Sequence, residues 1–193
     1  MNSKQSKNAV SKLINPLTNE YNQLKSIILS PRFNWNYLPC NVPEDNSGYN
    51  NFGFYHHETL QRKETRTHTS SPYLKQSLIV FKQILTHNNI PHSSPYRISF
   101  NSTHPTHNNN IPSPPHVDHH YPHDNLIVYL TPTYGGHTLV QRIPQPMEED
   151  GILLFNGEHN LYPPSEQRRV VIVYTFPQVA EKVVEKPVEN KYL

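Results

Sequence analysis

From Tyr96 onward, the chain consists of brief apolar runs that proline, asparagine and glycine separate. The runs are YRISFNS, NLIVYLT, HTLVQRI, GILLFN, EHNLY and RRVVIVYTF. Short runs at this spacing, with no helical pattern between them, are typical of antiparallel strands in a sandwich or jelly roll. The 19 prolines among 193 residues agree with a fold rich in turns. We therefore expect a mainly β fold class.

Two segments upstream predict helices that flank this sheet. Thr18 is a suitable N-cap for a helix over 18–29, in which apolar residues recur at helical spacing. Ser71 begins a second and stronger helical pattern over 71–89, whose apolar residues form one stripe. Aromatic alternation in FGFYHH, residues 52–57, predicts one short strand between the helices. The fold class is thus mainly β with flanking helices.

The length of 193 residues fits a single domain. Its expected parts are a loose N-terminus (1–17), a helical and irregular support (18–95), a β core (96–177) and a flexible tail (178–193). Asn156 and Gly157 stand between two of the β runs. This pair predicts a hairpin, because a two-residue primed turn needs positive φ at both central positions.

Composition excludes several function classes. The chain has 17 basic and 15 acidic residues and no basic block, so there is no electrostatic case for tight nonspecific nucleic-acid binding. The single cysteine, Cys40, rules out an internal disulfide and a thiol-based zinc site, and it favours a reducing compartment. No signal peptide and no apolar run of about 18 residues are visible. We expect a soluble cytoplasmic protein without a membrane partner.

One short motif predicts a metal site. His116 and Asp118 are two residues apart, so on a strand they project from the same face, about 7 Å apart. His159, beyond the Asn156-Gly157 pair, is the leading candidate for a third ligand. Two imidazoles and a carboxylate leave the opposite side of a metal open, which is the ligand set of mononuclear non-haem Fe(II) oxygenases. In a chain with 13 histidines, an isolated H-x-D also arises by chance.

The last β run contains two arginines that need an explanation. Arg168 shares one face of the run with Val170, and Arg169 shares the other face with Val171. Because both faces are apolar, the strand should be buried, and an arginine there needs an anion or must reach water. The distal carboxylate of 2-oxoglutarate would be such an anion, and Tyr129 could add a hydroxyl donor. Alternatively, both arginines flank a strand end in solvent.

The motifs taken together resemble those of the 2-oxoglutarate/Fe(II)-dependent oxygenase superfamily, nearest the prolyl-hydroxylase-like branch. The matching segments are HVD (116–118), YLT (129–131), YGGHT (134–138), DGILLFN (150–156) and HNLYPPSEQRRVVIVYTF (159–176). They span about a third of the chain. Farther upstream, ILSPRFNWNYLP and YRISFN are similar to small oxygenases that tailed phages encode, which would place the protein in the host cytoplasm.

The resemblance implies a double-stranded β-helix core of the jelly-roll or cupin-like kind. It implies that His116, Asp118 and His159 bind Fe(II), and that an arginine after the second histidine holds 2-oxoglutarate. Arg168 and Arg169 are both eligible, and the spacing from the histidine favours Arg168. Tyr129 lies where some relatives hold 2-oxoglutarate with a tyrosine. The implied reaction uses O2 to hydroxylate a substrate and releases succinate and CO2.

Several alternatives stay open from the sequence. A cupin-like enzyme with zinc or manganese on the same ligands is one, and a jelly-roll binding or virion structural protein is another. The substrate of an oxygenase can be a protein side chain, a nucleobase or a small molecule. His137 stands where prolyl hydroxylases often have an acidic residue, which speaks against peptidyl-proline. His119, His120 and His123 can contact substrate, form a competing metal site or be solvated.

Overall fold

The structure is a computed structural model that describes residues 10–42, 52–63, 66–68, 71–91, 93–107 and 109–178. The helices are α1 (Asn19–Leu29) and α2 (Leu74–His87). The strands are β1 (Val10–Leu13), β2 (Asn36–Leu38), β3 (Phe54–Lys63), β4 (Arg66–His68), β5 (Arg97–Thr103), β6 (His123–Tyr129), β7 (Thr138–Val140), β8 (Ile143–Gln145), β9 (Ile152–Phe155), β10 (His159–Leu161) and β11 (Arg169–Pro177). The expectation of a mainly β fold with flanking helices is confirmed.

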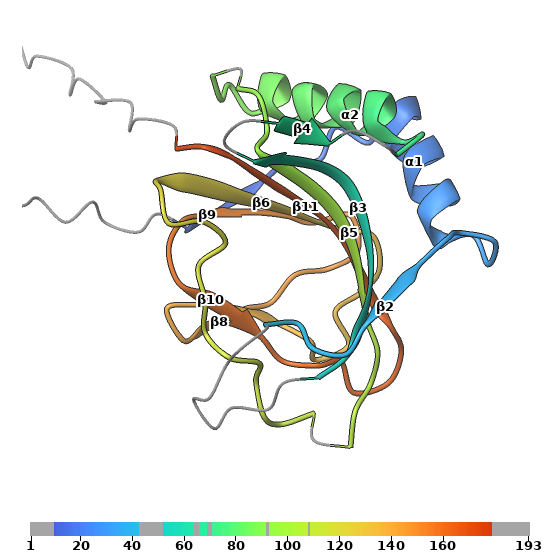
Figure 1. Ribbon diagram of the computed structural model, residues 1–193, viewed down its shortest axis with the longest axis vertical. Helices are drawn as coiled ribbons and strands as arrows, with labels where there is room; N and C mark the ends of the chain where they lie inside the picture. Colours follow the sequence, from blue (N-terminus) through green and yellow to red (C-terminus); the bar gives the residue numbers. More distant parts are fainter. Residues whose placement is uncertain are drawn as a thin grey trace, which may run out of the picture.

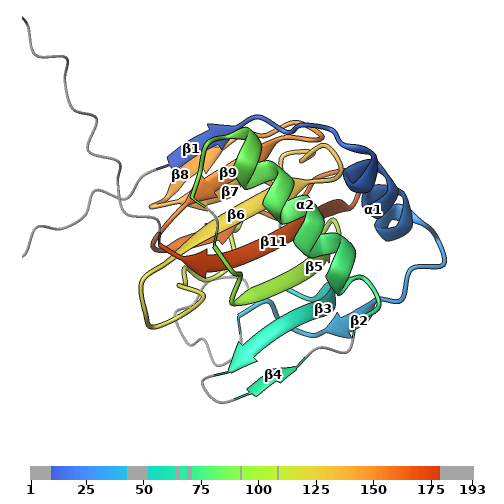
Figure 2. The same ribbon diagram turned by 90° about the horizontal axis from the view of Figure 1, so that it is seen from above.

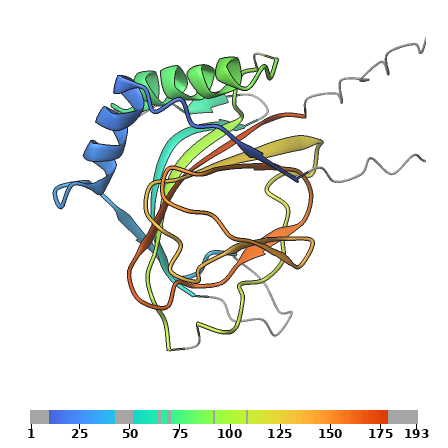
Figure 3. The same cartoon turned by 180° about the vertical axis from the view of Figure 1, so that it is seen from behind.

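The strands form two antiparallel sheets. The larger sheet has the order β1-β9-β6-β11-β5-β3-β2, with β4 paired to β3, and the smaller has the order β10-β7-β8. The smaller sheet lies opposite the face of the larger sheet that the helices do not cover (Figures 1 and 3). The two sheets therefore face each other. Over the described residues, neither helix is long and apolar enough to span a membrane.

Helix α1 begins as its sequence predicts. The Oγ1 atom of Thr18 accepts a hydrogen bond from the backbone N–H of Tyr21 at 3.2 Å, which satisfies one of the free donors at the helix start. Helix α2 begins at Leu74, somewhat later than the predicted 71–89. The Ser71 hydroxyl accepts from the N–H of Tyr73 at 3.2 Å, just before the first helical turn.

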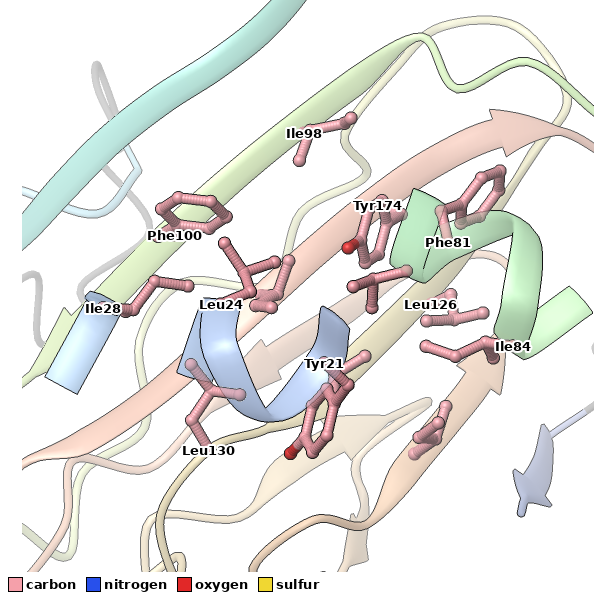
Figure 4. Packing of buried hydrophobic residues seen from close by; sticks show 14 of the residues in the cluster. Tyr21, Leu24, Ile28, Phe81, Ile84, Ile98, Phe100, Leu126, Leu130 and Tyr174 are labelled. Atoms are coloured by element: carbon pink, nitrogen blue, oxygen red, sulfur yellow. The ribbon is translucent and has the colours of Figure 1, made fainter. Parts of the chain in front are cut away.

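A hydrophobic core lies between the helices and the outer face of the larger sheet. Phe81 and Ile84 of α2 pack with Leu126 of β6 and Tyr174 of β11, all 2% exposed or less (Figure 4). Helix α2 crosses over β6, β11 and β5 (Figure 2). Burial of each such side chain contributes about 1.5–3 kcal/mol. This core holds the central strands in place.

A second, smaller core lies between the two sheets. Strand alternation sends every other residue of β11 inward, so Val171 and Val173 face this space while Ile172 faces the helices. Its members are Ile127, Tyr129, Val140, Met147, Leu153, Phe155, Val171 and Val173. Both faces of β11 are thus buried, as its sequence predicts.

The prediction of a hairpin at Asn156 and Gly157 is wrong. Strand β9 pairs with β1 and β6 in the larger sheet, whereas β10 pairs with β7 in the smaller one. Only Gly157 has a positive φ, 86°. A primed turn needs two such residues, so this segment instead carries the chain from one sheet to the other.

Three further expectations need correction or fall outside the described part. The N-terminus predicted as loose contains β1, which pairs with β9 in an antiparallel register. The short strand predicted over 52–57 is the start of β3, ten residues long. Within the predicted tail, only Gln178 belongs to the described residues, and so the tail stays a prediction.

Candidate metal centre

His116 and His159 lie opposite each other on two paired chain segments. The N–H of each residue donates to the carbonyl oxygen of the other, and both bonds are 2.9 Å long. Directly opposed residues of an antiparallel pair point to the same face. The two imidazole rings accordingly stand side by side, with centroids 4.5 Å apart. The pairing therefore brings together two histidines that are distant in sequence.

Asp118 completes a group of three. One candidate ligand atom from each of His116, Asp118 and His159 lies within 4.8 Å of the other two. The Oδ2 atom of Asp118 is 3.6 Å from Nε2 of His159, and these side chains are only 5% and 11% exposed. Among the described residues, no other three or more His, Cys, Asp or Glu side chains converge in this way. The structure thus brings together all three predicted ligands.

The backbone orients both imidazoles. Nδ1 of His116 lies 3.2 Å from the carbonyl oxygen of Pro114, and Nδ1 of His159 lies 3.3 Å from that of Gly157. A carbonyl oxygen only accepts, so it favours the tautomer with the proton on Nδ1. The lone pair of each Nε2 then faces away from the backbone and is available to a metal ion.

The local charges favour the protonation states that a metal requires. Burial by itself would raise the pKa of Asp118, but the Arg97 guanidinium and the two neighbouring imidazoles hold it well below its usual range. Burial lowers the pKa of His159 to about 4, against the opposing attraction of Asp118. At neutral pH the site therefore has an ionised carboxylate and a neutral His159 imidazole, and metals bind these forms.

The donor set fits a divalent transition metal. Oδ2 of Asp118 is buried and has no hydrogen-bond partner, although a buried carboxylate oxygen strongly needs one. A cation between Oδ2 and the two Nε2 atoms would meet that need. Two imidazole nitrogens and one carboxylate oxygen form the facial triad that binds Fe(II) in non-haem oxygenases.

The two candidate arginines lie on opposite sides of the larger sheet. Arg169, the first residue of β11, is 2% exposed and lines the space between the sheets. Its Nη2 donates to Oγ1 of Thr138 at 2.9 Å, and its Nε is buried without a partner. Arg168 instead donates from Nη2 to the carbonyl oxygen of Leu29 at 3.2 Å, at the end of α1. Of the two arginines, only Arg169 lines the pocket, and the spacing-based preference for Arg168 stays a prediction.

Tyr129 lies beside Arg169. The guanidinium carbon of Arg169 is 5.0 Å from the centroid of the Tyr129 ring. The Tyr129 hydroxyl is 2.7 Å from Oγ1 of Thr138, the same atom that Arg169 contacts. Sequence reasoning missed Thr138, although it stands within the YGGHT segment. The three side chains form one buried polar group.

A pocket between the sheets contains the triad and Arg169. The cavity has a volume of about 120 Å³. One wall consists of alternate residues of β5, namely Arg97, Ser99, Asn101 and Thr103. His56 lies across from Asn101 on β3, and its Nδ1 atom is 2.8 Å from Oδ1 of Asn101. The alternation of these polar residues with Ile98 and Phe100 was visible in the sequence, but we did not assign it to a site.

The histidines after Asp118 do not join the triad. Nε2 of His119 is 2.7 Å from the Thr175 hydroxyl, and its ring stacks on Tyr121 at 4.8 Å between centroids. Nδ1 of His123 lies 2.8 Å from the carbonyl oxygen of Tyr121. Burial, followed by the charge of Arg97, lowers the pKa of His119 to about 4. These contacts hold the loop, and no second metal group occurs here among the described residues.

Comparison with known proteins supports the same fold. No known protein family pattern matches the chain, and no curated protein matches its sequence. An oxidoreductase of the 2OG-Fe(II) oxygenase family from Burkholderia pseudomallei aligns with a TM-score of 0.55 and 12% identity, over 81% of this chain and 76% of that one. A prolyl-4-hydroxylase from Pseudomonas putida aligns with a TM-score of 0.52 and 11% identity, over 89% and 94%.

These likenesses show that the chain has the double-stranded β-helix fold of 2-oxoglutarate/Fe(II) oxygenases. Within that fold it carries an HxD…H triad, formed by His116, Asp118 and His159. The fold prediction is thereby confirmed. The comparisons give no support to the expected similarity to oxygenases that phages encode.

Proposed function

We propose that this protein is an Fe(II)- and 2-oxoglutarate-dependent dioxygenase that hydroxylates a substrate not yet identified. The observation that carries the proposal is the convergence of two histidines and one aspartate in a pocket that also contains a buried arginine. In the overall reaction, 2-oxoglutarate, O2 and a C–H bond would give succinate, CO2 and a C–OH group. Bound Fe(II) would supply the oxidising chemistry.

The triad would hold the metal from one side only. His116 and His159 offer their Nε2 atoms, and Asp118 offers Oδ2, which is buried and has no hydrogen bond. All three come from the edge of the smaller sheet and the loop beside it. The side of the metal that faces the larger sheet would stay open to 2-oxoglutarate and O2.

Arg169 would bind the distal carboxylate of 2-oxoglutarate. Its planar guanidinium can donate two parallel hydrogen bonds to a carboxylate, and Nε is still without a partner. Thr138 and Tyr129 hold the guanidinium and its surroundings in place. A buried cation without an anion is unfavourable, so this position favours a dicarboxylate co-substrate over the cupin-like alternative, which leaves Arg169 without a role.

Apolar side chains would keep water away from the co-substrate. Val171 and Val173 continue the inner face of β11 beyond Arg169, and Ile127 of β6 lies across from Val173 in the sheet register. Exclusion of water strengthens the ionic contact to Arg169 and protects a reactive intermediate from side reactions. The polar residues of β5 that line the pocket would contact the substrate.

The proposal is tested with purified protein, Fe(II), 2-oxoglutarate and O2. With ascorbate added as the two-electron reductant that replaces the C–H bond, we expect succinate to form slowly without a substrate. Asp118→Ala should abolish this succinate, whereas His120→Ala, on the exposed loop, should not change it. Quantitative mass spectrometry of succinate gives the readout.

Binding of metal and 2-oxoglutarate distinguishes a dioxygenase from the two alternative kinds of protein. Calorimetric titration of the Mn(II)-loaded protein with 2-oxoglutarate, without O2, should show one saturable site. A protein that binds metal but not 2-oxoglutarate would favour a cupin-like enzyme of another reaction type. A protein that binds neither, and whose properties do not change in Asp118→Ala, would favour a jelly-roll binding protein.

A further inference from the structure

One charged residue of the pocket belongs neither to the triad nor to the proposed co-substrate site. Arg97 is the first residue of β5, and its Nη2 lies 2.5 Å from Oδ1 of Asp118. The two side chains are 25% and 5% exposed, so the ion pair is partly shielded from water. An arginine in direct contact with a candidate metal ligand calls for a functional explanation.

The two oxygens of Asp118 have different environments. Oδ1 accepts the hydrogen bond from Arg97, whereas Oδ2 has no hydrogen bond and lies 3.6 Å from Nε2 of His159. A carboxylate can bind a metal through one oxygen or through both. Binding through both would require Oδ1 to turn away from the guanidinium, which would leave a charged group without its partner.

We propose that Arg97 is a positioning residue that restricts Asp118 to metal binding through Oδ2 alone. A second carboxylate oxygen on the metal would occupy a position that 2-oxoglutarate or O2 needs. Arg97 would thus keep the open side of the metal accessible. This inference rests on the proposed function and adds to it a residue outside the ligand set.

The fold fixes Arg97 firmly enough for this role. Strand β5 is central, because β11 pairs with it on one side and β3 on the other. The register places Arg97 across from Thr175 and Gln61, so hydrogen-bonded neighbours constrain its backbone on both sides. The guanidinium is planar and presents its donors in a rigid fork, so it can hold Oδ1 in one orientation.

The first test uses the unmodified protein with Zn(II) in place of iron. Infrared difference spectra with and without metal, on protein labelled with ¹³C-carboxylate aspartate, report how Asp118 binds. We expect the wide separation of the two carboxylate stretches that binding through one oxygen produces. Asp118→Asn removes the band and so assigns it. A narrow separation, as for binding through both oxygens, would overturn the inference.

The second test compares three variants. Arg97→Met keeps the length of the side chain without charge or donors, Arg97→Lys restores one charged donor, and Arg168→Met removes the same charge from the other face of the larger sheet. In Arg97→Met we expect the two-oxygen infrared signature and an affinity of the Mn(II)-loaded protein for 2-oxoglutarate that falls by about 10- to 100-fold. Arg97→Lys should recover part of both, and Arg168→Met should match the unmodified protein.

These tests can tell a failure of the inference about Arg97 from a failure of the proposed dioxygenase function. The infrared readout needs only a metal, so it stands even if 2-oxoglutarate does not bind. If Arg97→Met keeps the one-oxygen signature and an unchanged affinity for 2-oxoglutarate, Arg97 has no positioning role. If Arg97→Met does not fold, the infrared spectra of the unmodified protein and of Arg97→Lys still test whether Asp118 binds the metal through one oxygen. A protein that binds no metal refutes both the inference and the proposed function.

Discussion

Arg168 and Arg169 are adjacent in the chain, but they end in different environments. Arg168 donates to a backbone carbonyl at the end of α1, on the outer side of the larger sheet. Arg169 lies in the pocket between the sheets, next to Tyr129 and Thr138. One step along a strand reverses the face on which a side chain lies. The same change of charge should therefore have different consequences at the two positions.

The contrast extends over the two faces of β5 and β11. Outward residues such as Ile98, Phe100 and Ile172 are apolar, fully buried and packed under the helices. Inward residues of the same strands include Arg97 and Arg169, both of which carry a buried Nε without a partner. Unpaired buried polar atoms cost stability. The outer face is therefore apolar and packed, whereas the inner face combines a smaller apolar core with buried polar atoms that have no partner.

The largest effect is expected on the outer face. Phe81 of α2 packs on Tyr174 at 4.8 Å and on Phe176 at 5.2 Å between ring centroids. Phe81→Ala should reduce the free energy of unfolding by about 3–5 kcal/mol, through lost burial and a cavity. Ile79→Ala, at a 37% exposed position of the same helix, should change it by about 0.5 kcal/mol or less. Urea denaturation measures the free energy of unfolding of both variants. Equal losses in the two variants would contradict the stabilising role of the buried outer face.

The next effect concerns the arginine pair. Arg169→Met should weaken binding of 2-oxoglutarate to the Mn(II)-loaded protein by about 10- to 100-fold, since a charge-assisted hydrogen bond contributes about 1.5–3 kcal/mol. Arg168→Met should leave this affinity unchanged, because its side chain does not line the pocket. Isothermal titration calorimetry gives both constants. The reverse result would assign the co-substrate to the other face of β11.

A smaller effect concerns the pH dependence of the inner face. Burial lowers the pKa of His159 to about 4, from an ordinary value of 6.5. Folding thus favours the neutral imidazole, and this contribution to stability is complete above pH 6.5 and is lost as the pH falls toward 4. When the pH falls from about 7.5 to about 5.5, the free energy of unfolding of the metal-free protein should decrease. The decrease should be on the order of 1 kcal/mol larger than that of the His159→Gln variant. Urea denaturation at both pH values is the measurement, and parallel losses would exclude His159 as the source.

The smallest effect is expected at the start of α1. Thr18→Ala removes the hydroxyl that accepts from the N–H of Tyr21 and donates to Gln83. We expect a loss of about 1 kcal/mol in the free energy of unfolding. The affinity for metal should not change, because α1 covers only the outer face. A changed metal affinity would mean that the two faces are coupled.

Local patterns in the sequence were sufficient for part of this structure. The Thr18 cap and the apolar stripe of α2 predicted the helices. The spacing of His116 and Asp118 predicted that their side chains lie close together, but the strand expected there is wrong: His116 forms a single bridge with His159, and Asp118 lies in a bend. The apolar residues on both faces of RRVVIVYTF predicted a strand that is buried on both sides. Each of these features depends on neighbours within a few residues, where backbone geometry leaves little choice.

Other features could not be read from local patterns. Both faces of β11 are apolar, so its sequence does not tell which face meets the helices, and the spacing from His159 could not tell which of Arg168 and Arg169 lines the pocket. The Asn156-Gly157 pair looked like a hairpin because its residues favour tight turns, yet β9 and β10 join different sheets. Arg97 was overlooked because its partner, Asp118, is distant in sequence.

The sequence by itself determined which residues can supply a metal site, where both helices and several of the strands lie, and that the strand after the second histidine is buried. Only the tertiary structure decided which strands pair, which face of β11 looks into the pocket, and that Arg97 meets Asp118. The physical reason is that strand periodicity is a property of neighbouring residues, whereas pairing and packing depend on the burial of the whole chain.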